Sequence, residues 1–134
     1  MDASLQHMEA AGSAAKVSVF AMPKRGHAPD EYEDAYAVSP SDGWPLHAAV
    51  ADGATETAFA RRWAEVLAAG WVEQAPCEPA AWTQALSGWR RDWAAHVARR
   101  TQQQPWYAAA KAEQGAFAAL LGLSVQADGT WQAL

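Results

Sequence analysis

The sequence predicts an α+β domain built from antiparallel strands and two long antiparallel helices. Short apolar runs bounded by clusters of turn-forming residues occur in the first 53 residues and again after residue 114, and such runs are typical of strands. Between them, tryptophans and other apolar residues recur at three- and four-residue steps, which is the period of an amphipathic helix. A length of 134 residues with 51% hydrophobic residues suits one domain with a modest core.

Composition argues against several classes of protein. The net charge of −5 argues against nonspecific binding to nucleic acid. The single cysteine, Cys77, excludes an intramolecular disulfide, and no Cys–His pattern indicates a zinc site. No apolar run is long enough to span a bilayer, and the first residues lack the basic head and apolar core of a secretion signal. We therefore expect a cytoplasmic protein that does not bind membranes.

The first part of the chain predicts a leader and three strands. Residues 1–15 are small and polar, and we expect them to form a flexible leader. A first strand is predicted over 16–22, because apolar and polar residues alternate there. Second and third strands are predicted over 34–38 and 46–51, joined by the turn-rich segment 39–45. An antiparallel hairpin of these two strands would place the start of one beside the end of the other.

The middle of the chain predicts two helices. The first is expected over 55–72, and the second over 79–100, where a proline at the start and arginines at the end favour a helix. The tryptophans of both segments lie at the spacing of one buried face. We therefore expect them to pack in a core against a sheet, rather than to form a surface that stacks on a ligand.

The last part of the chain returns to strand patterns. The segment 105–111 begins with Pro-Trp-Tyr and predicts a short helical turn, whose aromatic pair would pack on the helical layer. The run 115–125 is small and apolar throughout, as expected for a strand covered on both faces. A turn centred on Asp-Gly follows at 127–130, and a fifth strand begins at Trp131.

Carboxylates stand at the ends of two predicted strands. Glu33 and Asp34 open the second strand, whereas Asp52 ends the third and is followed by Gly53. Three carboxylates brought together would repel one another unless a cation lay among them, and Mg²⁺ and Mn²⁺ prefer such oxygen ligands. Gly53 would allow a ligand to approach its carbonyl. Taken singly, each motif also fits a plain turn or a solvated acidic loop.

In this order the motifs resemble the metal-dependent protein phosphatase 2C (PPM-type) serine/threonine phosphatases, in particular their bacterial branch. The resemblance rests on Glu33 to Ala35, Val50 to Ala54, the long helix that follows, and the later run 115–123. It implies the N-terminal part of an α-β-β-α sandwich, with two antiparallel sheets flanked by helices. The later segments that complete the family's metal site are not in this sequence. The resemblance therefore implies a partial, truncated phosphatase domain over 16–134.

The resemblance also implies a mechanism and a role for each site residue. Two Mg²⁺ or Mn²⁺ ions would be bridged by Asp52, and a metal-bound hydroxide would attack the phosphorus of a phosphoserine or phosphothreonine in a protein substrate. Glu33 and the carbonyl of Gly53 would hold one metal, and Asp34 would assist it. Arg25, in the loop before the acidic motif, would orient the phosphate through its planar guanidinium, although a solvated loop is the alternative there.

Three hypotheses remain open from the sequence. The first is a metal-dependent protein serine/threonine phosphatase, catalytic when complete, that is present here as a truncated domain with little or no turnover unless a second chain supplies the missing half. The second is a noncatalytic binding or regulatory module that retains part of the phosphatase fold. The third is a tryptophan-rich helical interaction domain unrelated to phosphatases, which would be mostly helical and would not depend on residues 33–53.

Overall fold

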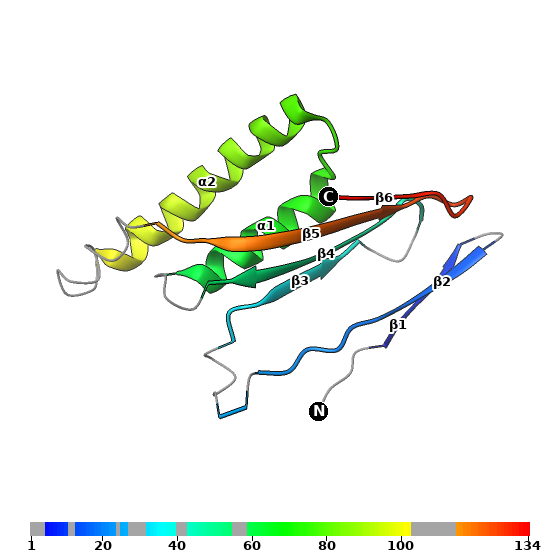
Figure 1. The fold of residues 1–134 in the computed structure, drawn as a ribbon, viewed down its shortest axis with the longest axis horizontal. Coiled ribbons are helices and arrows are strands. Elements are labelled where there is room, and N and C mark those ends of the chain that lie inside the picture. The colour runs from blue at the N-terminus through cyan, green and yellow to red at the C-terminus, as the bar shows by residue number, and fades with distance from the viewer. Residues whose placement is uncertain are drawn as a thin grey trace.

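The computed structural model describes residues 5–10, 13–23, 25–26, 32–39, 43–54, 59–102 and 115–134. Within these ranges an antiparallel four-stranded sheet packs against two helices, which confirms the α+β class (Figure 1). This strand content contradicts the hypothesis of a mostly helical domain. The elements in chain order are β1 (Leu5–Ala10), β2 (Ser13–Ser18), β3 (Ala35–Val38), β4 (Leu46–Gly53), α1 (Ala60–Gln74), α2 (Pro79–Thr101), β5 (Ala118–Val125) and β6 (Trp131–Ala133).

The predicted strands and helices of the sheet and the helical layer are present, with shifted ends. β4 runs past the predicted range of 46–51 because Asp52 and Gly53 still pair with β5. α2 begins at its proline and has its arginines in the last turn, as predicted. The first residues predicted for α1, 55–58, and the predicted turn at 105–111 lie outside the described residues. In the described part of the chain, neither helix combines the length and apolar character that crossing a membrane requires.

The N-terminal hairpin differs from the prediction. β1 lies within the segment 1–15, for which we expected a leader, and β2 begins at Ser13 rather than at Lys16. The two strands pair antiparallel, from Leu5 opposite Ser18 to Ala10 opposite Ser13. In Figure 1 the hairpin lies on the side of the four-stranded sheet away from the helices. Strand pairing depends on a partner strand, so the composition of one segment does not report it.

Small side chains line the face of the sheet that the helices cover. The strand order is β3-β4-β5-β6, and every neighbouring pair is antiparallel. Alternate residues of a strand point to the same face, so this face can be read from the buried positions. Apart from Leu120 and His47, the residues on it are Ala35, Ala37, Ala49, Ala51, Gly53, Ala118, Gly122 and Ser124.

Trp71 of α1 fills the space that these small residues leave. Its side chain is fully buried, with 0% of its surface exposed. A Cβ atom at Gly122 of β5 would lie 2.3 Å from the Trp71 ring, so the ring lies directly on the glycine backbone. The indole Nε1 donates a hydrogen bond to the carbonyl oxygen of Leu123 at 3.4 Å. Gly122 is therefore required for α1 to approach the sheet this closely.

α2 packs chiefly on α1, and its Ala85 and Trp89 belong to the same buried core as Ala49 and Ala51 of the sheet. Trp89 is buried as predicted, but it packs on Gly70 of α1, where a Cβ atom would lie 2.3 Å from the Trp89 ring. Trp82 meets Trp89 edge to face, with ring centroids 5.5 Å apart. The two helices are antiparallel, and α2 rises away from the sheet at an angle (Figure 1).

Candidate functional site

The predicted acidic motifs meet at one end of the sheet, on the face away from the helices. Ala35 of β3 pairs with Ala51 of β4, so the preceding Asp34 stands opposite Asp52. Directly opposed residues of an antiparallel pair point to the same face, and Asp52 is exposed there. The antiparallel hairpin therefore brings the two motifs side by side, because it places the start of β3 beside the end of β4, as predicted. We call Glu33, Asp34, Asp52 and Gly53 the acidic corner.

Gly53 joins three backbone segments at the acidic corner. A Cβ atom at this position would lie 2.6 Å from the carbonyl oxygen of Glu33 and 3.2 Å from the carbonyl group of Ala60. The next residue, Ala54, donates its N–H to the carbonyl oxygen of Phe117 at 2.9 Å. No side chain fits at residue 53 without a shift of backbone. Gly53 therefore holds the end of β4 against both the approach to β3 and the start of α1.

Tyr32 also belongs to this site, although the sequence analysis gave it no role. Burial raises the pKa of the Tyr32 phenol above its usual value, and the negative charges of Asp34, then Tyr36 and Asp52, raise it further. The phenol therefore stays protonated beside the carboxylates and can donate a hydrogen bond. The sequence feature that could have identified Tyr32 is its position two residues before Asp34. In an extended segment this spacing places both side chains on one face.

A cleft of about 400 Å³ lies over the acidic corner. Its floor is the outer face of β3, β4 and β5, and its other wall is formed by the segment that follows β2, including Phe20. Asp34 and Asp52 supply carboxylates to the cleft, and Tyr32 and Tyr36 add their phenol side chains to an otherwise apolar lining. A cleft of this size with a few converging polar groups suits a small ligand.

The carboxylates match only part of the predicted metal site. In the described residues, no three His, Cys, Asp or Glu side chains form a group that could hold a metal ion. Glu33, Asp34 and Asp52 are all described, so they do not form the cluster of three carboxylates that the sequence suggested. Glu33 precedes β3, whose register with β4 begins at Ala35 opposite Ala51, and its carbonyl oxygen lies where a Cβ atom of Gly53 would stand.

Two opposed carboxylates nevertheless fit a hard divalent cation. Mg²⁺ is commonly held by one or two carboxylates and keeps several waters, so Asp34 and Asp52 supply suitable oxygens. Ligation by Glu33, Asp34, Asp52 and the carbonyl of Gly53 stays a prediction.

Arg25 is exposed in a turn with Gly26, whose φ is 89°, and it is not among the residues that line the cleft. Its role in orienting a phosphate stays a prediction. A different arginine is close by, because Ala60 touches Gly53 and Arg61 follows it at the start of α1.

Comparison with known proteins returns no relative. No protein-family model, no curated protein and no solved structure matches the chain. The resemblance to the PPM-type phosphatases therefore rests on the residues of the acidic corner and their order along the chain, and a function has to be argued from the geometry.

Proposed function

We propose that the acidic corner is part of a Mg²⁺ or Mn²⁺ site for the hydrolysis of phosphoserine and phosphothreonine esters in proteins, as in the PPM-type phosphatases that the sequence resembles. The observation that supports it is the opposition of Asp34 and Asp52 across β3 and β4, beside the glycine that the motif requires. Two strand ends hold the carboxylates in place, so no loop has to order before a cation binds.

Each residue of the site has a role that its surroundings support. Asp52 and Asp34 would hold the cation, which when bound supplies positive charge for the phosphate oxygens and an activated water. Tyr32, kept neutral by burial and by the two carboxylates, would donate a hydrogen bond to a phosphate oxygen. The apolar wall of the cleft, including Phe20, would exclude bulk water and strengthen these interactions.

The arrangement of layers supports the finer architecture, the N-terminal part of an α-β-β-α sandwich. Helices cover one face of the four-stranded sheet, and the end of β2 with the following residues lies over the other face. A cleft of about 310 Å³ separates them there, lined by Val17 to Phe20 on one side and by Tyr36, Val50 and Leu121 on the other. A second β layer on this face is what the sandwich requires.

The test is Mn²⁺-dependent hydrolysis of p-nitrophenyl phosphate by the purified chain, compared with Asp52→Asn and Asp34→Asn. Activity that needs Mn²⁺ and is lost in both variants would support the proposal. Asp128→Asn is the matched control, since Asp128 lies in the exposed β5–β6 turn and accepts hydrogen bonds from Thr130. Equal activity in all four proteins would contradict it.

A second candidate is a noncatalytic binding or regulatory module with the same fold. The outer face of the sheet supports it, because Tyr36, Val50 and Leu121 keep 49%, 54% and 57% of their surfaces exposed. Large apolar side chains in one exposed row are typical of a surface that a further layer or a partner covers. Mn²⁺ binding measured by calorimetry separates the candidates. No binding, and no hydrolysis above that of Asp52→Asn, would favour the module.

A further inference from the structure

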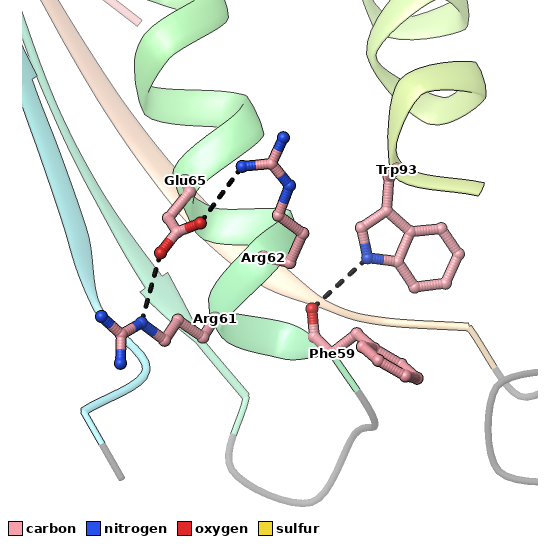
Figure 2. Close-up of polar contacts among 5 residues, drawn as sticks. All are labelled: Phe59, Arg61, Arg62, Glu65 and Trp93. Atoms are coloured by element: carbon pink, nitrogen blue, oxygen red, sulfur yellow. Dashed lines mark hydrogen bonds and ion pairs between the residues drawn. The ribbon is translucent and has the colours of Figure 1, made fainter. Parts of the chain in front are cut away.

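Two contacts bring the start of α1 beside the end of α2. The indole Nε1 of Trp93 donates a hydrogen bond to the carbonyl oxygen of Phe59, which precedes α1, at 3.3 Å (Figure 2). The rings of Trp63 and Trp93 meet edge to face, with centroids 6.3 Å apart. These contacts hold the first turn of α1 next to Trp93, just over two turns before the end of α2.

Positive charge gathers at this junction, although the chain has a net charge of −5. Arg99 and Arg100 are exposed in the last turn of α2, and Arg62 lies in the first turn of α1. His96, one turn after Trp93 on α2, is acted on by the charges of all three. Its pKa is lowered, first by burial and then by the charges of Arg62, Arg100 and Arg99, while Glu65 acts in the opposite direction. We call Arg62, Arg99, Arg100 and His96 the arginine cluster.

Glu65 orients the arginines of α1 and leaves donors free. One of its carboxylate oxygens accepts from Nε of Arg61, and the other from Nη1 of Arg62, each at 3.2 Å (Figure 2). Both arginine side chains are about half exposed, at 50% and 41%. In the described part of the chain neither guanidinium has another hydrogen-bond partner. The Nε atom of Arg62 is buried without a hydrogen-bond partner, so of its remaining donors only the Nη groups are open to a further acceptor.

The stability of α1 does not explain why these arginines are there. The amino end of a helix has a partial positive charge and is stabilised by acidic residues, yet the first turn of α1 has no acidic residue and begins Ala60-Arg61-Arg62. The partial charge of the helix end and the charges of the arginines therefore have the same sign. An anion bound at the junction would reduce the repulsion between them.

We propose that the arginine cluster docks an acidic, phosphate-bearing segment of a protein. Guanidinium groups match phosphate and carboxylate oxygens with paired hydrogen bonds, and they are presented here by two rigid helices. A short segment fits better than a long polyanion, because Asp92 lies one turn before His96 and the acidic corner lies at the same end of the molecule. The inference deepens the proposed function, on which it rests only for the view that the docked segment is a substrate.

Docking can be measured without turnover, in the presence of a metal chelator. The probe is a fluorescein-labelled peptide with a central phosphoserine flanked by glutamates, titrated with the full chain and followed by fluorescence anisotropy. We expect the double change Arg99→Gln and Arg100→Gln to raise Kd about tenfold, through the loss of charge-assisted hydrogen bonds. Higher salt should also weaken binding, because these groups are exposed.

The matched control is the double change Arg90→Gln and Arg91→Gln. It removes the same charge from the same helix, but neither residue is among the charges that act on His96, and both lie more than two helical turns before Arg99. We expect the control to change Kd less than about twofold, because only long-range attraction is lost. Thermal melts of both double variants establish that each remains folded.

Three outcomes would overturn the proposal. Equal losses in the two double variants would show that only net charge matters. Equal affinity for a peptide with serine and glutamine in place of phosphoserine and glutamate would exclude anion recognition. Tighter binding of a single-stranded oligonucleotide of the same charge would identify nucleic acid as the ligand. If Arg99→Gln with Arg100→Gln slows hydrolysis of phosphopeptides but not of aryl phosphate, the arginine cluster docks substrates for the active site. If the double variant loses hydrolysis of both substrates, the change has damaged the acidic corner instead.

Discussion

The two faces of the four-stranded sheet differ in the size of their side chains. The face under the helices consists almost entirely of alanine, glycine and serine, and the volume of its core comes from α1, chiefly from the fully buried Trp71. On the outer face the strands supply the volume themselves, through the cross-strand row of Tyr36, Val50 and Leu121. About half the surface of each of these three side chains remains exposed.

Close packing against the helices constrains only the inner face of the sheet. Close approach of a helix to a sheet needs small residues on one partner and large ones on the other, since protein interiors are packed without voids. The outer face is under no such constraint from the helices. It has the carboxylates of the acidic corner at one end and an apolar row beside them. The inner face therefore holds the fold together, and the outer face keeps large side chains half exposed.

The largest effect is expected at Gly122, on the inner face. Gly122→Val would drive a side chain into the Trp71 ring, which already lies where a Cβ atom would stand. We expect a loss of about 3 kcal/mol in the free energy of unfolding, at the upper end for overpacked cores. The measurement is urea unfolding. The control is Ala119→Val, which enlarges a side chain on the same strand at an exposed position of the outer face. It should lower the free energy of unfolding by less than about 0.5 kcal/mol. Equal costs would remove the distinction between the faces.

A smaller effect on stability is expected on the apolar row of the outer face. Val50→Thr together with Leu121→Thr should lower the free energy of unfolding by about 1 kcal/mol, because both side chains are already half exposed. Any self-association through this face should weaken, and sedimentation velocity would detect it. A loss comparable to that of Gly122→Val would mean that another part of the chain covers the row.

The smallest effect is expected in the titration of Tyr32. Its pKa is raised in the folded state, so its contribution to stability is fully present below the usual phenol pKa of about 10 and is lost as the pH rises through the folded value. The ultraviolet absorbance of tyrosinate, compared between the wild type and Tyr32→Phe, isolates this phenol. Asp52→Asn should lower its pKa only slightly, since burial is the larger cause. A Tyr32 phenol that titrates at its usual pKa would mean that it does not lie beside the carboxylates.

The sequence predicted part of the acidic corner. It placed acids at adjoining ends of two strands, and their convergence follows from the antiparallel hairpin. It did not separate Glu33 from Asp34, because which of two adjacent residues faces outward depends on the register with β4. Nor did it identify Tyr32, because the location of this residue relative to the carboxylates depends on how the preceding segment folds in space.

What the sequence by itself determined is local: the strand after the Trp-Pro turn, the helix from Pro79 to Thr101, and the carboxylates at strand ends. These features depend on residue spacing within one segment, which the chain shows directly. Only the tertiary structure decided that β1 pairs with β2, that α2 packs on Gly70 of α1, and that the start of α1 lies beside Trp93 of α2. Each of these depends on contacts between segments distant along the chain, where shape complementarity selects the partner.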